Sequence, residues 1–176
     1  MAAIGQTGWA IVQRECAVIF VTVGAQMPFD RLVISLDKWA GDNGRNDVFA
    51  QIGQSEYQPS NMQWTKFLQL DEFKCKYEAA KVIVAHAGTG SIITALRLGK
   101  PILIMPRRAS LRETRNDHQI ATAEQFRHFD SVEVAWDERE LVAKLEDINN
   151  WHGSQRIESY ASGELVNAIR EFIDGC

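Results

Sequence analysis

A single stretch, residues 82–107, constrains the fold of this chain more than any other part of it. It reads VIVAHAGTGSIITALRLGKPILIMPR. An apolar run of strand length opens the stretch, and a second one, residues 102–105, comes near its end. Between them apolar residues recur at helical spacing, and Gly99 and Pro101 mark the end of that helix. The stretch therefore predicts a strand–helix–strand unit, with a small turn at residues 86–91.

We expect this turn to bind an anion. Glycine lets the backbone approach a ligand closely, and the start of a helix presents unpaired N–H groups and the positive end of the helix dipole. The expected ligand is the diphosphate of a nucleotide-sugar. A tight turn without any ligand is the plainer alternative. The residues in question are Gly88, Thr89, Gly90 and Ser91, preceded by His86, whose plainer role is to cap the turn.

The rest of the chain continues the alternation of strands and helices. Strands are expected at residues 17–23, 48–52, 62–68 and 131–135. Helices are expected at residues 28–39, 71–80, 116–128, 137–148 and 157–172, with Asp71 as a cap and Asp137 as the first residue of its helix. This alternation predicts an α/β fold with a single Rossmann-like, doubly wound parallel sheet.

Residues 1–15 are weakly patterned, and we interpret them as a tail of uncertain order. The expected domain is therefore residues 16–176. In a parallel sheet of this kind, ligands bind beyond the carboxyl ends of the strands. Polar loops follow predicted strands at residues 24–28, 53–58 and 86–91, and a polar segment follows Met105. Their convergence predicts one crevice.

Composition and charge argue against several functions. The net charge of −4 is unlike that of a general nucleic-acid binder, whose surface is usually basic. The three cysteines lack metal-ligand spacing and indicate reduced thiols in a cytosolic protein. The apolar run at residues 16–25 is shorter than the roughly 20 residues that span a bilayer. Membrane attachment is therefore expected through a partner or a surface patch.

Common nucleotide-binding motifs do not fit this sequence. Gly88 and Gly90 match two glycines of the dinucleotide fingerprint, but Ile93 occupies its third small position, which argues against a dehydrogenase. Lys100 is followed by Pro101 and has no glycine-rich run at Walker spacing before it, which excludes the usual P-loop. The chain also has no Asp-x-Asp pair for a metal-bound diphosphate. Neither a metal nor another cofactor is therefore expected.

Several segments together resemble the C-terminal, donor-binding half of family 28 glycosyltransferases, which have the two-lobed GT-B architecture. They are FVTVGAQ with PFDRL at residues 20–32, AHAGTGS at 85–91, GKP to MPR at 99–107, and Glu113 with RNDHQ at 115–119. The chain is most similar to stand-alone versions of that half. These are the soluble subunit of the enzyme that adds the second N-acetylglucosamine to the dolichol-linked oligosaccharide, and the soluble subunits of bacterial exopolysaccharide glycosyltransferase pairs. The MPR and RNDHQ runs favour the bacterial branch.

The resemblance implies where a UDP-sugar would lie. The turn at Gly88 would hold the diphosphate, and the loop near Gly53 and Gln54 would lie by the base. His118 and Gln119 match positions that read sugar hydroxyls. The other residues implied to line the pocket are Gly24, Gln26, His86, Arg107, Glu113, Asn116 and Asp117, although Asn116 and Asp117 suit a helix cap equally well.

The sequence departs from the family pattern in two places. Thr94 stands where many relatives have a glutamate that binds the ribose, and Arg112 stands where a Gly-Glu-His run often begins. Four arginines concentrate positive charge near the predicted sugar. We hypothesise that one of them pairs bidentately with a carboxylate, which favours a uronic-acid donor such as UDP-glucuronate. A solvated face, or a patch for anionic lipid or a partner, is the alternative for Arg107, Arg108, Arg112 and Arg115.

The resemblance implies a cytoplasmic subunit that transfers a sugar from a UDP-sugar to a polyprenol-linked or dolichol-linked acceptor with inversion. The sugar would be glucuronic acid, glucose or N-acetylglucosamine. GT-B transfer needs two lobes, so the acceptor site is expected on a membrane-anchored partner, at the inner face of the membrane. The catalytic base is expected on that partner, with His86 as the candidate within this chain. The alternatives are a non-catalytic nucleotide-sugar-binding regulatory or scaffold subunit, and a self-contained homodimeric enzyme.

Overall fold

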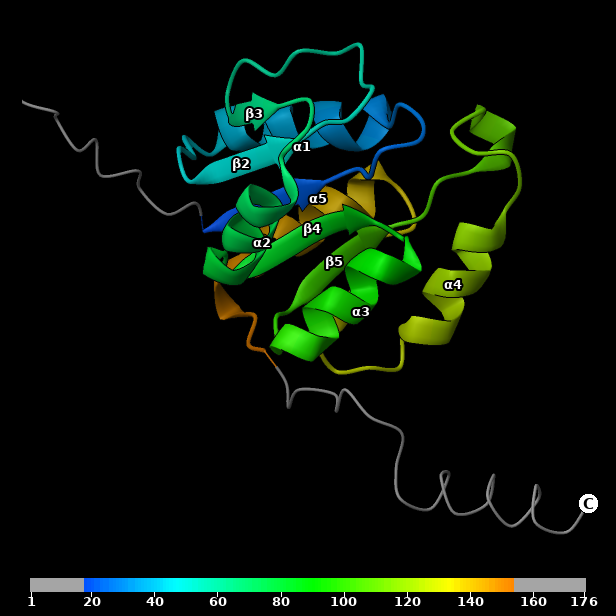
Figure 1. Cartoon of the computed structure of the whole chain (residues 1–176). Coiled ribbons are helices and arrows are strands. Elements are labelled where there is room, and N and C mark those ends of the chain that lie inside the picture. Colours follow the sequence, from blue (N-terminus) through cyan, green and yellow to red (C-terminus); the bar gives the residue numbers. More distant parts are fainter. Residues whose placement is uncertain (1–17, 154–176) are drawn as a thin grey trace, which may run out of the picture.

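The computed structural model describes residues 18–153 (Figure 1). The tail predicted for residues 1–15 and the last predicted helix, residues 157–172, lie outside the described residues, so the domain limits stay a prediction. Within the described part, six parallel strands form a sheet in the order β3-β2-β1-β4-β5-β6. The chain starts at the centre and moves outward in both directions, which confirms the predicted doubly wound fold.

The predicted strands and helices of residues 18–153 are all present. The strands are β1 (Ile19–Thr22), β2 (Val48–Gln51), β3 (Gln63–Thr65), β4 (Val82–His86), β5 (Ile102–Met105) and β6 (Val132–Val134). The helices are α1 (Asp30–Asp42), α2 (Leu70–Ala79), α3 (Thr89–Leu98), α4 (His118–Phe126) and α5 (Glu138–Glu146), with short 3-10 turns η1 (Ala109–Leu111) and η2 (Ile148–Asn150). None of these helices is long and apolar enough to cross a membrane.

Helices cover the sheet on both faces (Figure 1). Ile19 and Val21 of the central strand pack on the face covered by α1 and α5. Phe20, between them, packs on the opposite face with residues of α2, α3 and α4. Strands β1 and β5 are fully buried. Burial on both faces explains why these strands are continuous apolar runs rather than alternating ones.

Helix α3 begins three residues before its apolar periodicity predicted. Strand β4 extends to His86, only Ala87 and Gly88 form the turn, and Gly88 is the N-cap of the helix. The hydroxyl of Thr94 donates a hydrogen bond to the carbonyl of Gly90 at 2.7 Å, within the first turns. Apolar spacing marks only the residues that face the core, and this first turn faces solvent. The predicted phosphate turn is therefore mostly the helix itself.

The predictions for the two acidic residues at helix starts, Asp137 and Asp71, have different outcomes. Asp137 is the N-cap of α5, and its carboxylate accepts hydrogen bonds from two backbone N–H groups of the first turn at 2.9 Å. These bonds lower the pKa of Asp137. The prediction for Asp71 was wrong, because Gln69 precedes α2 and Asp71 lies in its first turn. Acidic residues suit both positions, since each places negative charge at the positive end of the helix dipole.

Candidate functional site

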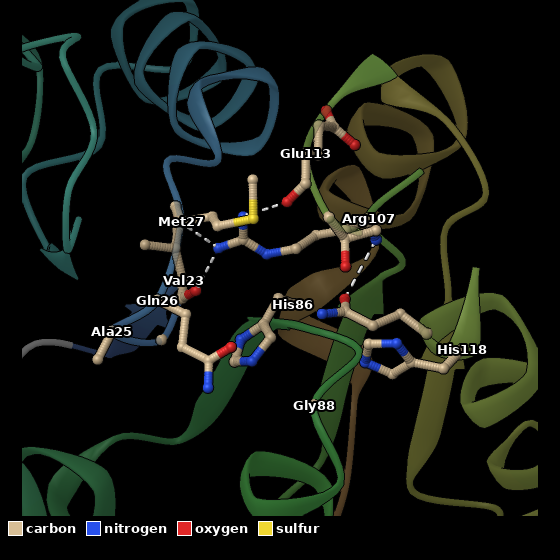
Figure 2. A pocket seen from close by; sticks show the side chains of 12 residues that line it. Val23, Ala25, Gln26, Met27, His86, Gly88, Arg107, Glu113 and His118 are labelled. Atoms are coloured by element: carbon tan, nitrogen blue, oxygen red, sulfur yellow. Dashed lines mark hydrogen bonds between the residues drawn. The ribbon is translucent and has the colours of Figure 1, made fainter. Parts of the chain in front are cut away.

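A pocket that encloses about 380 Å³ opens at the carboxyl ends of β1, β4 and β5 (Figure 2). Its lining comes from the β1–α1 loop, the start of α3, and the segment that runs from β5 into α4. The lining residues are Val23, Gly24, Ala25, Gln26, Met27, His86, Gly88, Arg107, Glu113, Thr114, His118 and Gln119. Three of the four segments predicted to converge therefore line the same pocket.

The fourth segment, with Gly53 and Gln54, supports the β1–α1 loop instead of lining the pocket. The side-chain amide of Gln54 donates to the carbonyl of Ala25 at 3.2 Å. Gly53 has a positive φ of 58°, and a Cβ there would lie 2.5 Å from the carbonyl oxygen of Gly24. Only glycine accommodates both conditions. Gly53 and Gln54 therefore hold the shape of a neighbouring loop.

The imidazole of His86 lies between two glycines in the pocket. A Cβ on Gly24 would lie 2.9 Å from its Cε1, and a Cβ on Gly88 would lie 2.3 Å from its Nε2. The absence of side chains on these glycines leaves the space that the imidazole fills. Its Nδ1 lies 3.5 Å from the carbonyl oxygen of Thr22. This contact favours the proton on Nδ1 and leaves Nε2 as an acceptor.

His86 is neutral at pH 7. Burial lowers the pKa of its imidazole to about 4, and the positive charge of Arg107 acts in the same direction. A neutral imidazole offers a hydrogen bond to a ligand but no positive charge. Because this pKa lies far below 7, the imidazole is also a weak general base.

The guanidinium of Arg107 binds backbone carbonyls across the pocket wall (Figure 2). Its Nη1 donates to the carbonyls of Pro28 at 2.6 Å and Glu113 at 3.0 Å. Its Nη2 donates to the carbonyls of Val23 and Met27, both at 2.7 Å. Every hydrogen on these two nitrogens is therefore engaged, and they cannot also hold a sugar carboxylate.

The structure does not support the predicted pairing of an arginine with a uronic acid. Arg108 donates from Nη2 to the carbonyl of Trp136 at 2.6 Å, outside the pocket. Arg112 and Arg115 are exposed and are not among the residues that line it. Of these four described arginines, none directs a free guanidinium into the pocket.

The carboxylate of Glu113 is also engaged within the protein. It accepts hydrogen bonds from Nε and Nη2 of Arg31 at 2.7 and 3.0 Å, and from the backbone N–H of Arg108 at 2.9 Å. The side chains of Glu113 and Arg31 are only 10% and 11% exposed. The pair ties α1 to the segment after β5. Glu113 was a predicted site residue, but its partner Arg31, 82 positions away, was missed.

The residues predicted to read sugar hydroxyls lie at the start of α4. Gln119 is buried, and its side-chain oxygen accepts from the N–H of Arg107 at 3.2 Å, which leaves its amide nitrogen for a ligand. His118 lines the pocket, and its Nδ1 contacts the side-chain oxygen of Asn116. Asp117 is the N-cap of α4 and accepts from the N–H of Ala109 at 2.8 Å. Asn116 and Asp117 therefore hold the pocket wall and do not line it.

The N-terminus of α3 joins the pocket through Gly88. Among the residues that the structure describes, no side chain caps this terminus. The N–H groups of its first turn, Thr89 to Ser91, therefore have no acceptor within the helix. Outside its own stretch of helix, a Cβ on Gly90 would meet no described atom within 4 Å, so the space beside this residue is open. The arrangement suits an anion such as a phosphate.

Within residues 18–153, no group of three or more His, Cys, Asp or Glu side chains is placed to hold a metal ion.

The sequence profile of the glycosyltransferase family 28 C-terminal domain matches residues 18–169. The chain belongs to this family. This family 28 domain is 26% identical over 123 residues to a Yarrowia lipolytica protein named UDP-N-acetylglucosamine transferase subunit ALG13. The alignment covers 61% of this chain and 59% of the Yarrowia protein, which is less than two thirds of that protein's length.

Solved structures show the same fold. An NMR solution structure of ALG13 superposes with a TM-score of 0.58 at 19% identity, covering 83% of this family 28 domain and 92% of that chain. A crystal structure of the glycosyltransferase of kitacinnamycin gives 0.59 at 17% identity, covering 84% of this chain and 38% of that one. The prediction of the C-terminal half of a GT-B glycosyltransferase is thereby confirmed for family and fold.

The backbone at Arg112 has the conformation that the glycine of the family 28 pattern would adopt at this position. Arg112 has a φ of 58°, the only positive value at a described residue other than glycine. This left-handed conformation suits glycine, which is what the Gly-Glu-His run would place there. The turn at this position brings the carboxylate of Glu113 back to the N–H of Arg108.

Proposed function

We propose that this chain is the donor-binding subunit of a UDP-sugar-dependent glycosyltransferase, with UDP-N-acetylglucosamine as its donor. The observation that carries the proposal is the uncapped N-terminus of α3, which opens beside a pocket lined by polar side chains. Membership of family 28 supports the transfer chemistry. The name of the Yarrowia relative, a UDP-N-acetylglucosamine transferase subunit, supports both the donor and the need for another subunit.

A neutral donor sugar fits the charges in the pocket. The charged groups in its lining are already engaged. Arg107 binds backbone carbonyls, and Glu113 binds the guanidinium of Arg31 and the backbone N–H of Arg108. The remaining polar side chains of the lining are Gln26, His86, Thr114, His118 and Gln119, of which His86 is neutral at pH 7. Amides, hydroxyls and imidazoles bind sugar hydroxyls and an acetamido group, whereas a uronate would need a cation.

In this proposal the diphosphate lies on the N–H groups of Thr89, Gly90 and Ser91. Helix-end N–H groups, rather than a metal ion, stabilise its charge. The base lies toward the loop of Gly53 and Gln54, and the sugar lies toward His118 and Gln119. No cofactor other than the donor substrate takes part.

In the transfer step, a second protein supplies the acceptor and the base. The oxygen of the acceptor hydroxyl attacks the anomeric carbon from the side opposite the diphosphate. The bond from that carbon to the diphosphate oxygen breaks, UDP leaves with the electron pair, and the configuration inverts. The hydroxyl proton passes to a base on the partner, because the low pKa of His86 makes it a poor base. The partner is anchored in the membrane and holds a polyprenol-linked acceptor at the cytoplasmic face, for an exopolysaccharide or a related glycan.

A transfer assay tests this function. The purified chain is given labelled UDP-N-acetylglucosamine, UDP-glucose or UDP-glucuronate, with and without membranes of the source cells. We expect a labelled lipid-linked product from UDP-N-acetylglucosamine, only when membranes are present, and at an undiminished rate in EDTA. Binding without turnover under every condition would favour the regulatory or scaffold subunit instead. Transfer by the chain alone to a soluble acceptor would favour a self-contained homodimer.

A further inference from the structure

The two segments that face each other across the pocket are joined by the side chain of Arg107 (Figure 2). Three of the four carbonyls that it binds, those of Val23, Met27 and Pro28, belong to the β1–α1 loop. The fourth, that of Glu113, belongs to the segment after β5. The guanidinium thus bridges two chain segments about 80 positions apart in the sequence, as the separations of 79 to 84 residues show.

The backbone of Arg107 holds a further part of the pocket. Its N–H donates to the side-chain oxygen of Gln119 at 3.2 Å, which orients the amide nitrogen of Gln119 for a ligand. Its side chain fixes the loop that contains Gly24, and Gly24 packs on the imidazole of His86. Arg107 therefore contacts or indirectly places groups on three sides of the pocket.

Burial makes this bridge rigid. Arg107 is only 4% exposed, and its guanidinium carbon lies 4.7 Å from the centre of the Phe29 ring. Among the described residues, no carboxylate hydrogen-bonds to Arg107. Four carbonyls in a planar fork are a geometry that lysine cannot reproduce, since its ammonium is a single point charge.

We propose that Arg107 is a positioning residue of the donor site, which sets the distance between the β1–α1 loop and the segment that leads from β5 into α4 and holds His86 between Gly24 and Gly88. This role deepens the proposed function and rests on it for the identity of the ligand.

The charge of Arg107 gives the proposal a second, measurable consequence. The groups that face His86 are the carbonyl of Thr22, the two flanking glycines and the guanidinium of Arg107, while Glu113 and His118 also line the pocket. Burial and Arg107 together lower the pKa of His86 to about 4, and Arg107 itself stays protonated at pH 7 because burial lowers its pKa only to about 10. Removing that charge raises the pKa of His86.

The experiment compares Arg107→Gln, Arg107→Lys and the exposed control Arg139→Gln. The readouts are affinity for UDP-N-acetylglucosamine, the NMR titration midpoint of the His86 ring, and amide exchange of residues 24–27. We expect Arg107→Gln to weaken binding about tenfold, raise the midpoint and speed exchange. Arg107→Lys keeps the charge and loses the fork, so we expect faster exchange with a midpoint near that of the wild type. Arg139→Gln is expected to change none of them.

The proposal would be overturned if folded Arg107→Gln kept the wild-type affinity for UDP-N-acetylglucosamine, the wild-type titration midpoint of His86 and the wild-type amide exchange of residues 24–27. If Arg107→Gln does not fold, Arg107→Lys serves as the test. Wild-type amide exchange in residues 24–27 together with wild-type affinity in Arg107→Lys would also overturn the proposal. If the wild type itself does not bind UDP-N-acetylglucosamine, the proposed function fails. The His86 midpoint and the loop exchange would still test Arg107, since neither needs a ligand.

Discussion

Glu113→Ala is expected to lower the free energy of unfolding by about 3 kcal/mol. The substitution leaves the guanidinium of Arg31, only 11% exposed, without its two short hydrogen bonds to a carboxylate. It also leaves the N–H of Arg108 without its acceptor. The loss lies at the low end for a broken buried pair, because Arg31 keeps the carbonyl of Pro106 at 3.0 Å. Urea unfolding followed by tryptophan fluorescence measures the change.

The chain offers a matched control for this substitution. Glu138 approaches the same guanidinium, but at 3.5 Å and with 47% of its side chain exposed. Exposed ion pairs contribute little, so Glu138→Ala is expected to lower stability by less than about 1 kcal/mol. Equal losses from the two variants would show that burial of the Glu113 pair does not matter.

His86 is expected to make the protein less stable by about 2 kcal/mol at pH 5 than at pH 7. An imidazole in the unfolded chain gains a proton near pH 6.5, whereas the folded His86, whose burial lowers its pKa, gains one only near pH 4. Between these values the unfolded state binds more protons, so stability falls as the pH falls. The full interval corresponds to about 3 kcal/mol. Urea unfolding at pH 7, 6 and 5 measures the change.

His86→Gln separates this effect from other acid-sensitive groups. Glutamine has no proton to gain in this range, so the variant is expected to lose the His86 share of the pH dependence, whatever its stability at pH 7. His128→Gln, which removes an exposed histidine, is expected to keep the wild-type dependence. A wild-type slope in His86→Gln would mean that His86 titrates alike in the folded and unfolded states.

The strands were the most predictable part of the fold. Residues 19–22 and 102–105 are buried on both faces. Strands buried in this way consist of a continuous apolar run, which is visible in the sequence. The start of α3 was less predictable. Its first turn, from Thr89 to Ser91, faces solvent beside the pocket and carries no apolar signal. A turn that faces solvent rather than the core lacks the packing contacts that apolar periodicity detects.

The pocket residues were predictable by position more than by role. Gly24, His86, Gln119 and others were expected near the ligand, and the structure places them in its lining. Sequence did not show that Arg107 and Glu113 already have partners within the protein. Residue type states which hydrogen bonds a side chain can make. Whether carbonyls 79 to 84 positions away, or Arg31, already make those bonds depends on the folded chain.

Binding of UDP-N-acetylglucosamine to the start of α3 is the most direct test of the proposed site. Amide NMR shifts on titration are expected to concentrate at residues 86–91 and 113–119. Gly90→Asp is expected to keep the fold, because its Cβ meets no described atom within 4 Å and an acidic residue suits a first turn. Its carboxylate would repel the diphosphate and weaken binding at least about tenfold. Leu70→Asp, at the exposed start of α2, is the control and should bind as the wild type does. Undiminished binding by Gly90→Asp, or shifts confined to other segments, would contradict the assignment of the α3 N-terminus as the diphosphate site.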